Sequence, residues 1–214
     1  MSGPAGPARF PVQESIQSIP MSGVLPGSAI SPFVGEWLPR VAEAVGVNGR
    51  PRRALDLAMG EGRHAVPLAL AGFLTFGVDR SVERLATACL AARDQRLTFH
   101  AWAADLDTYP LPVERFDLLF CTRFLLRARW DDLKRCVRPG GFVMYETFTI
   151  RQVKHGRGPS SPDHLLDPGE LAAAFSGWEI LFAEEVDAPT AMARLVARKP
   201  DAARQASIDQ GRRS

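Results

Sequence analysis

The stretch Leu55-Asp56-Leu57-Ala58-Met59-Gly60-Glu61-Gly62-Arg63-His64-Ala65 decides the fold of this chain. An apolar run over residues 54–58 carries one acid, Asp56, and breaks into a Gly-x-Gly turn. We expect a strand over 54–58 and a helix over 64–71. A strand, a glycine turn and a helix in this order let the backbone approach a nucleotide-like ligand, because a side chain at the turn would block the ligand or forbid the turn.

Outward from this stretch, expected strands alternate with expected helices. The pattern predicts further strands over 73–78, 97–102, 116–121 and 142–146, and further helices over 33–45, 82–92 and 130–136. The sequence Arg138-Pro139-Gly140-Gly141 is expected to form a tight turn before the strand over 142–146. This alternation predicts an α/β fold with a parallel, doubly wound sheet.

The last third of the chain departs from this alternation. A short helix is expected over 168–175, where Asp167 and Glu170 form a helix-capping signature. Two β-like segments follow, over 178–184 and 191–197. A hairpin-like pair of this kind at the end of a parallel sheet is unusual for a dinucleotide dehydrogenase.

We expect one domain with two polar extensions. Residues 1–31 are rich in Gly, Pro and Ser and are predicted to form a flexible arm or lid, and residues 199–214 to form a disordered tail. The domain itself is expected over 32–198. Its first helix has Ser31 as a candidate N-cap, and Pro39 inside it is expected to kink or split the helix.

The composition excludes several classes of protein. The 214 residues are 46% hydrophobic and 23% charged, with a net charge of +2, which is ordinary for a globular domain and too small to argue for a nucleic-acid partner. No apolar run approaches the roughly 18 residues of a membrane span, and the N-terminus has no apolar signal-peptide core. The three cysteines form no Cys-x-x-Cys pair, so we expect reduced thiols, a cytoplasmic location and no metal site. A monomer or a homodimer are both left open.

Acids follow the expected strands at the points where ligands bind. Asp79 ends the second strand, and Asp105, with Leu106 beside it, follows the third. Because ligands of open α/β sheets bind outside the carboxyl ends of the strands, these acids are expected to gather near the glycine turn. An acid about twenty residues past the turn can accept both hydroxyls of a ribose. Asp117 enters its strand instead of leaving it, and we assign it to structure.

Together these features resemble the class I S-adenosylmethionine-dependent methyltransferases, over roughly residues 33–198. The segments 60–65, 145–148 and 158–171 are similar to those of small bacterial methyltransferases of the tellurite-resistance type. The resemblance implies a Rossmann-like, mostly parallel sheet of seven strands whose last strand is antiparallel. It also implies S-adenosylmethionine as the cofactor.

The resemblance further implies which residues contact the cofactor. The first acid and the glycine turn would approach the methionine portion, the acid after the second strand would hold the ribose, and the acid after the third strand would face the adenine amino group. Relatives often have Gly where Ala58 stands and Cys where Met59 stands, and we expect binding to survive this change. The expected cofactor-binding residues are Asp56, Ala58, Gly60, Gly62, Asp79, Arg80, Asp105 and Leu106.

The substrate side of the site is expected at the ends of the fourth and fifth strands. Tyr145 and Glu146 are candidates for a base or an orienting group, and Arg123 borders them. Alternatively, Glu146 pairs with an arginine such as Arg123 to fix the site. His64 in the first helical turn is more often a packed or capping histidine than a catalyst.

A second candidate on the substrate side is the loop over 151–163. Arg151, Lys154, Arg157 and His155 would attract an anionic substrate if they faced the cleft, although a charge run is more often a solvated loop. His164 could reach the cleft from the same segment.

The sequence therefore predicts a methyltransferase that acts on a small molecule, with an anion among the candidate acceptors. One alternative is a cofactor-binding module that works as a sensor or partner subunit without turnover. Another is an NAD(P)-dependent oxidoreductase, because Gly60, Gly62, Ala65 and Asp79 satisfy the loose dinucleotide fingerprint. Asp56, the acid after the third strand and the terminal β pair argue against the oxidoreductase. The sequence leaves a thiol, an oxyanion, a carboxylate and a hydroxyl open as acceptors.

Overall fold

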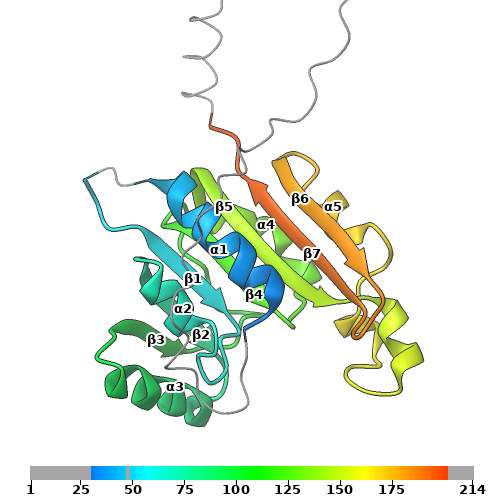
Figure 1. Ribbon diagram of the computed structural model, residues 1–214, viewed down its shortest axis with the longest axis horizontal. Helices are drawn as coiled ribbons and strands as arrows, with labels where there is room; N and C mark the ends of the chain where they lie inside the picture. The colour runs from blue at the N-terminus through cyan, green and yellow to red at the C-terminus, as the bar shows by residue number, and fades with distance from the viewer. Residues whose placement is uncertain (1–29, 47–48, 202–214) are drawn as a thin grey trace, which may run out of the picture.

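Seven strands form a single sheet in the computed structural model, which describes residues 30–46 and 49–201. Their order across the sheet is β3-β2-β1-β4-β5-β7-β6 (Figure 1). The strands from β1 to β5 pair in parallel, and β7 is antiparallel to both of its neighbours. The predicted α/β fold with a mostly parallel sheet and an antiparallel last strand is therefore confirmed. The strands are β1 (Arg53–Leu57), β2 (Leu74–Asp79), β3 (Phe99–Ala103), β4 (Phe116–Thr122), β5 (Val137–Phe148), β6 (Glu179–Val186) and β7 (Met192–Arg198).

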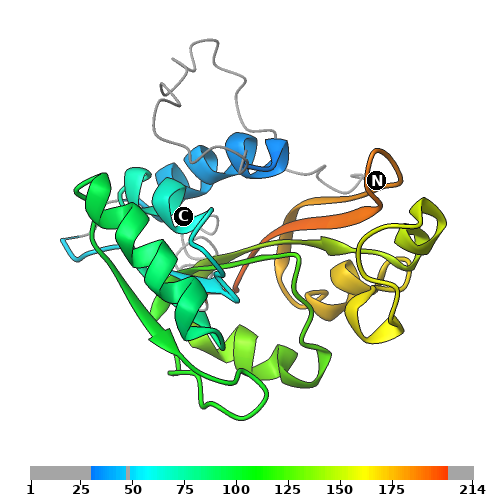
Figure 2. The same cartoon turned by 90° about the horizontal axis from the view of Figure 1, so that it is seen from below.

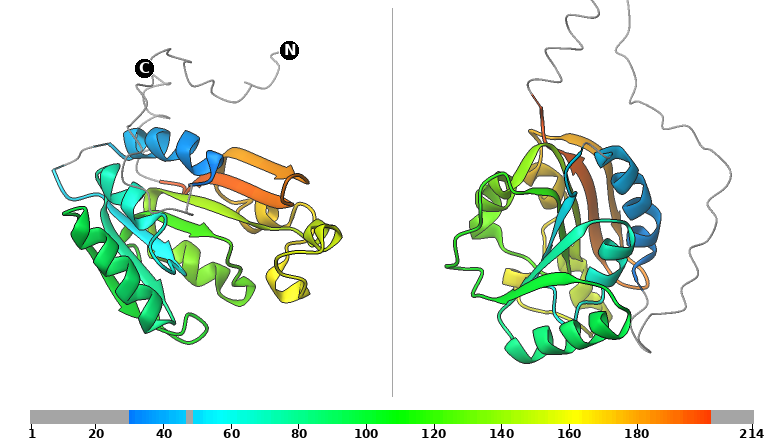
Figure 3. Two further views of the ribbon diagram at one scale, coloured as in Figure 1. Left: turned by 60° about the horizontal axis from the view of Figure 1, so that its bottom comes forward. Right: turned by 90° about the vertical axis from the view of Figure 1, so that its left-hand side faces the viewer.

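Helices cover both faces of this sheet. Figure 2 shows α1, α2 and α3 on one face and α4 and α5 on the other, and Figure 3 shows the same layers from two further directions. The helices are α1 (Pro32–Val45), α2 (Ala65–Leu70), α3 (Val82–Asp94), α4 (Trp130–Cys136) and α5 (Glu170–Ala174). Three short 3₁₀ helices are η1 (Arg127–Arg129), η2 (Ile150–His155) and η3 (Pro162–His164).

Helix α1 shows why the chain packs in this way. Its apolar residues recur at helical spacing, so one stripe is buried against the sheet. The rings of Phe33 and Trp37 pack against Phe182 of β6, with centroid distances of 5.8 and 5.1 Å. The helix runs on through Pro39 as one element, so the expected split does not occur.

The fifth strand is longer than its sequence predicted. The segment expected to turn at Pro139-Gly140-Gly141 lies inside β5. Its backbone is held in the sheet by residues beyond β7, because Gly140 N–H donates to the Lys199 carbonyl at 3.1 Å and Lys199 N–H donates to the Gly141 carbonyl at 2.8 Å. The pairing with β4 is irregular here, because Phe116 lies opposite Val137 but Leu118 lies opposite Phe142. The expected turn residues therefore form a bulge within β5, with Gly140 at a φ of 74°, and Lys199 ties this bulge to the end of β7.

Two expected helix caps form only in part. Ser31 occupies the N-cap position of α1, but its hydroxyl makes no capping bond. Gly169, in a left-handed conformation, holds the N-cap position of α5, so the helix expected from 168 begins at Glu170. Only the backbone half of the expected Asp167–Glu170 signature forms, in which Asp167 N–H donates to the Glu170 carboxylate at 2.7 Å.

The expected arm over 1–31 and tail over 199–214 lie almost wholly outside the described residues, and they stay predictions. Within the described ranges, no helix is long and apolar enough to cross a membrane. Cys89, Cys121 and Cys136 are free thiols, the first exposed and the other two buried. The part of the chain that the structure describes contains no cluster of His, Cys, Asp and Glu suited to a metal ion.

Candidate functional site

The candidate site lies at the carboxyl ends of the parallel strands. Strand β1 pairs with β2 on one side and with β4 on the other, so the chain leaves β1 where the strand order reverses. This reversal opens the crevice in which ligands of doubly wound sheets bind. The loop over 58–64 leaves β1 at this point, and the segments after β2, β3, β4 and β5 end on the same edge.

The glycine turn is built from left-handed backbone. Ala58, Gly60 and Gly62 have φ angles of 54°, 56° and 78°. Gly62 packs so tightly on α3 that a Cβ there would lie 2.9 Å from the Cβ of Ala88. Glycine is required at such positions, since an L side chain is strained in this region and would also collide with the helix. Ala58 carries that strain, because its Cβ disfavours the left-handed backbone that the turn imposes.

Asp79 ties the end of β2 to this turn. One carboxylate oxygen accepts a hydrogen bond from Gly60 N–H at 2.8 Å, and the other accepts one from Ser81 N–H at 3.0 Å. Each carboxylate oxygen has capacity for a second bond, so Asp79 can still accept ribose hydroxyls. Arg80, the next residue, is exposed. The expected position of Asp79 beside the turn is thus the observed one.

Asp56 is a buried acid with an incomplete hydrogen-bond set. The residue is 2% exposed, and its Oδ2 has no hydrogen-bond partner. Burial raises the pKa of Asp56 to about 8, opposed by the positive charge of Arg63 and reinforced by the negative charge of Asp79. A cationic ligand beside Asp56 would both pair its charge and satisfy its free oxygen.

The segment after β3 carries the residues expected at adenine. Asp105 is exposed and accepts a hydrogen bond from Asp107 N–H at 3.0 Å. Arg129 of η1 holds the segment in place, because its guanidinium donates to the carbonyls of Leu106, Asp107 and Tyr109 at 2.9–3.2 Å. The sequence did not predict the role of Arg129, since no local pattern marks an arginine that binds backbone 20–23 residues away.

A histidine joins the glycine turn to the end of β4. The Nδ1 of His64 and the hydroxyl of Thr122 are 3.1 Å apart, and the His64 ring packs against Phe120 with a centroid distance of 5.0 Å. Its Nε2 is buried without a partner. Burial and the charges of Arg63 and Arg123 lower the pKa of His64 to about 3, so the ring stays neutral at physiological pH. The expected packed histidine is therefore what the structure shows.

Glu146 at the end of β5 has a different partner from the one expected. Its Oε1 accepts hydrogen bonds from the Ser31 hydroxyl and from Arg194 Nε, each at 2.8 Å. The expected pairing of Glu146 with an arginine is observed, but the partner is Arg194 and not Arg123. Arg123 contacts Glu146 through its backbone N–H, which donates to the Glu146 carbonyl at 2.8 Å. Arg194 lies directly opposite Glu146 on β7, a register that the sequence could not supply.

Tyr145 does not face the crevice. Its side chain is fully buried, and its hydroxyl donates to the Phe124 carbonyl at 2.8 Å. Alternation along a strand explains this placement, since neighbours on β5 point to opposite faces of the sheet. Burial raises the pKa of Tyr145 well above its ordinary value. In place of the expected base or orienting group, Tyr145 is a core residue that supports the segment after β4.

The basic segment over 151–163 is turned toward the β6–β7 hairpin. Arg151 pairs with Asp187 at 3.0 Å, and Arg157 donates to the Pro189 carbonyl at 2.8 Å. His155 Nε2 lies 2.6 Å from the Asp187 carbonyl. His164, in η3, is exposed. The hairpin thus occupies most of the groups that were expected to attract an anionic substrate.

Asp117 lies at the opposite edge of the sheet and is structural, as expected. Its two oxygens accept hydrogen bonds from the Arg50 guanidinium at 2.6 and 2.9 Å, and one also accepts from Arg53 N–H at 2.8 Å. Arg138 adds a second ion pair at 3.3 Å. Burial raises the pKa of Asp117, but the bonds from Arg50 and Arg53 outweigh it and leave the pKa below its ordinary value.

Comparison with known proteins agrees with this architecture. Residues 54–141 match the family model described as a methyltransferase domain. An S-adenosylmethionine-dependent methyltransferase from Mesorhizobium loti superposes with a TM-score of 0.58 at 21% identity, covering 75% of this chain and 96% of that one. TehB from Haemophilus influenzae superposes with a TM-score of 0.59 at 21% identity, covering 75% of this chain and 61% of that one.

A curated relative by sequence carries a different name. Hemagglutinin 1 of Eikenella corrodens is 30% identical over 142 residues, which are 63% of this chain and 46% of that protein. The chain therefore spans about half the length of this relative. The solved structures show that the fold is the one used by S-adenosylmethionine-dependent methyltransferases.

Proposed function

We propose that this chain is a class I S-adenosylmethionine-dependent methyltransferase, which binds S-adenosylmethionine at the carboxyl edge of β1 and β2 and transfers its methyl group to a small acceptor. The matching family model and the shared fold support the proposal. The proposal rests above all on Asp56, a fully buried acid with an unpartnered oxygen beside the glycine turn. The methionine portion of S-adenosylmethionine carries an ammonium and a sulfonium, so it would supply the cationic partner that the free oxygen of Asp56 lacks.

The other expected contacts follow the order of the strands. Asp79 would accept hydrogen bonds from the ribose hydroxyls, because its carboxylate oxygens keep free lone pairs after accepting from Gly60 N–H and Ser81 N–H. Asp105 would accept from the adenine amino group, with Leu106 beside it in the segment that Arg129 holds. The glycine turn would admit the methionine portion, and Arg80 would lie at the ribose end.

When bound, S-adenosylmethionine supplies a methyl group that is already activated for displacement. The protein's task is then to align the acceptor and to exclude water, and such positioning can supply about 7–11 kcal/mol. Glu146 would orient an acceptor; its fixed position supports this role, since Ser31 and Arg194 hold its Oε1 while its Oε2 has no hydrogen bond among the described residues. It would take a proton only from an acceptor that arrives protonated.

The oxidoreductase alternative fits the sheet poorly. A dinucleotide-binding sheet continues in parallel as 3-2-1-4-5-6, whereas here β7 inserts antiparallel between β5 and β6. The buried Asp56 would also lie beside a negatively charged pyrophosphate, which would repel its charged form. The sensor alternative predicts cofactor binding without turnover.

Calorimetry separates these functions. Binding of S-adenosylmethionine and S-adenosylhomocysteine, with no binding of NADH or NADPH, is the expected result. Asp79→Ala should weaken binding roughly 30-fold, equivalent to about 2 kcal/mol. The exposed Asp94→Ala variant at the end of α3 is the control and should bind normally. Wild-type affinity in Asp79→Ala would contradict the ribose assignment, and nicotinamide binding would overturn the function.

Turnover is tested with S-adenosylmethionine labelled in its methyl group, offered with small thiols, carboxylates, oxyanions and phenols in turn. Transfer of label to one class supports the enzyme. Cofactor binding with no transfer to any class would favour the sensor or partner subunit.

A further inference from the structure

The sheet ends in two terminal strands, β3 on one side and β6 on the other (Figure 1). Each has one neighbouring strand among the described residues, so the backbone on its outer side has no strand partner. Such backbone can bind a further strand, and proteins prevent this with charged side chains and bulges on their terminal strands. The two terminal strands of this chain differ in this protection.

Strand β6 is protected and β3 is not. Strand β6 carries the glutamates Glu179, Glu184 and Glu185, and the register of its pairing with β7 shifts near its start. The five residues of β3 include no Asp, Glu, Lys, Arg or Pro, and their register with β2 is regular. Strand β3 therefore lacks the features that would block the addition of a strand.

The backbone of β3 points alternately toward β2 and outward. The Ala104 N–H donates to the Asp79 carbonyl at 3.0 Å. Because the direction alternates along a strand, the N–H and C=O groups of Phe99, Ala101 and Ala103 point away from β2. Among the described residues, these outward groups have no hydrogen-bond partner. They present donors and acceptors at the spacing that an added strand requires.

Both faces of β3 offer side chains to a neighbouring strand. Phe99 and Ala101 pack with the cluster under α3 and stay half-buried. On the other face, the His100 ring stacks on Phe76 with a centroid distance of 4.9 Å, and His100 is exposed. Trp102 lies on the same face as His100 and is half-buried. A strand added beside β3 would therefore bury further apolar surface on both faces.

We propose that β3 pairs antiparallel with β3 of a second copy of this chain, about a two-fold axis at Ala101. In this register all three outward residues pair with one another, since Ala101 lies opposite Ala101 and Phe99 opposite Ala103. The pairing supplies about six backbone hydrogen bonds. His100 and Trp102 then lie opposite each other in the closer, non-hydrogen-bonded positions, where aromatic cross-strand pairs are stabilising. The two sheets become one continuous sheet across the dimer.

The charges at the two ends of β3 are complementary in this arrangement. The chain enters β3 past Arg93 and Arg96, with Asp94 between them, and leaves it past Asp105 and Asp107. All five are exposed, and within the described part of the chain none forms an ion pair. Antiparallel pairing places the net positive start of one strand beside the net negative end of the other, whereas parallel pairing would place like ends together.

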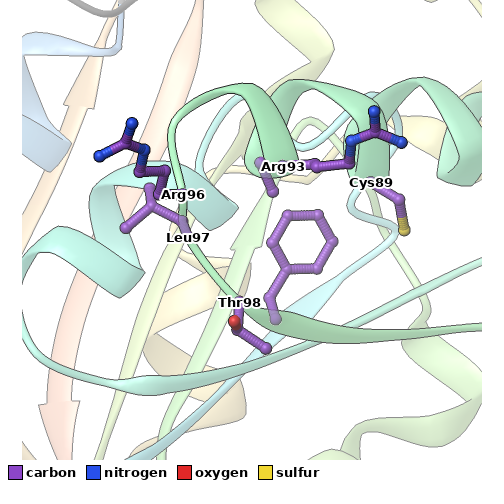
Figure 4. Close-up of a pocket in the computed structure, with 7 residues that line it drawn as sticks. Cys89, Arg93, Arg96, Leu97 and Thr98 are labelled. Carbon is purple, nitrogen blue, oxygen red and sulfur yellow. The ribbon is translucent and has the colours of Figure 1, made fainter.

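A pocket lies where the acids of the second copy would approach. It has a volume of about 290 Å³ and is lined by the end of α3 and the start of β3. Figure 4 shows the side chains of Arg93 and Arg96 on opposite sides of this pocket. In the proposed register Arg96 lies opposite position 106 of the second copy, between Asp105 and Asp107 of that copy. Each pocket would thus receive the segment that follows β3 in the other copy.

The first experiment is sedimentation velocity over about 1–200 μM protein. The wild type should pass from monomer to dimer in this range, because one short strand per copy makes an interface at the small end of specific interfaces. Ala103→Lys adds a charge to the exposed end of β3 and should weaken the dimer by about 10-fold or more. Ala183→Lys, the same change at an exposed alanine of β6, is the matched control and should dimerise as the wild type does.

The second experiment exchanges the charges. Arg93→Glu and Asp107→Arg each place like charges together and should each weaken the dimer. The double variant restores opposite charges and should return the dimer affinity to within about 3-fold of the wild type. Both residues are exposed, so these variants keep the test valid if Ala103→Lys fails to fold. Recovery in the double variant would not follow from a structural role of either residue alone.

Three results would overturn the proposal. The first is a wild type that stays monomeric over the whole range. The second is a dimer whose affinity is unchanged in Ala103→Lys and in Asp107→Arg. The third is an equal loss in Ala103→Lys and Ala183→Lys, which would mean that the dimer does not depend on β3. None of these outcomes involves the cofactor, so the proposed function is tested separately.

Discussion

The amino and carboxyl ends of the parallel strands, here called the amino edge and the carboxyl edge, differ in how completely their buried carboxylates are paired. At the amino edge, Asp117 is shared by Arg50, Arg138 and the Arg53 N–H, so its carboxylate is fully paired. At the carboxyl edge, Asp56 has a free buried oxygen. The same residue types, on neighbouring strands of one sheet, are therefore satisfied at one edge and left incomplete at the other.

The incompleteness coincides with backbone strain. Of the four described residues other than glycine that have positive φ, Ala58 and Arg123 lie at the carboxyl edge beside Asp56 and His64. Asp117, on the strand next to β1, shows that this sheet can supply a buried acid with a complete set of partners. The unpaired groups and the strain instead indicate an edge arranged for a ligand.

The largest expected effect comes from Asp56→Asn. The pKa of Asp56 is about 8 in the native protein and about 3.8 unfolded, so between pH 4 and pH 8 the native state holds a proton that the unfolded state has lost. The free energy of unfolding of the wild type should therefore fall as pH rises through this window. The asparagine variant lacks this proton, and its advantage should grow by about 1.4 kcal/mol per pH unit.

Urea unfolding of both proteins from pH 4 to pH 9 measures this difference. Above pH 8 the two profiles should run parallel, with the variant more stable and its cofactor affinity reduced. Parallel profiles over the whole range would contradict the picture of an unpaired buried acid.

The matching change at the other edge should have the opposite sign. Asp117→Ala leaves Arg50, Arg138 and the Arg53 N–H without their acceptor, and it should destabilise the protein by about 3 kcal/mol at pH 7. Because the pKa of Asp117 is lowered, this stabilisation is present above pH 4 and is lost as pH falls through the native pKa. Denaturant unfolding at pH 7 and pH 3 checks both statements.

Cofactor affinity separates the two edges further. Folded Asp117→Ala should bind S-adenosylhomocysteine as the wild type does, since the residue lies at the far end of β4. A loss of affinity comparable to that of Asp79→Ala would erase the distinction between the edges.

A smaller effect is expected from the two tyrosines of the chain. Tyr145→Phe removes the hydroxyl that donates to the buried Phe124 carbonyl and should cost about 1–2 kcal/mol of stability. Tyr109→Phe is the control, because Tyr109 is 41% exposed and its hydroxyl makes no hydrogen bond among the described residues. Once an acceptor is known, the pH profile of methyl transfer should be the same in Tyr145→Phe and wild type. A shift of this pH profile in Tyr145→Phe would instead indicate that Tyr145 acts as a base.

The features that were predicted from the sequence share a short range. The strand that carries Asp56, the turn at Gly60 and Gly62, and the acid at the end of β2 each depend on a pattern of a few residues, and the resemblance supplied the antiparallel last strand. The switch in strand order then brings these segments together without further information.

The features that were missed depend on distant partners. The ion pair of Glu146 and Arg194 joins residues 48 positions apart in the sequence, and it depends on the β5–β7 register. The bond from Arg129 to the Leu106 carbonyl joins residues 23 positions apart. The extension of β5 through Gly140 likewise requires Lys199. A single sequence carries no local sign of such pairs, so Arg123 was the natural but wrong partner for Glu146.

The smallest expected effect tests the strain at the glycine turn. Ala58 has a φ of 54° and lies between Asp56 and Gly60, so Ala58→Gly relieves a conformation that disfavours a side chain while making the unfolded chain freer. The first effect outweighs the second where φ is positive, and a net gain of about 0.5–1 kcal/mol is expected. Arg96→Gly, at a φ of 55° far from the crevice, should gain a similar amount. If the strain at Ala58 is maintained for the ligand, its relief should also change S-adenosylhomocysteine affinity, whereas Arg96→Gly should change stability alone. Equal stability gains with unchanged affinity in both variants would mean that the strained turn is tolerated and contributes nothing to binding.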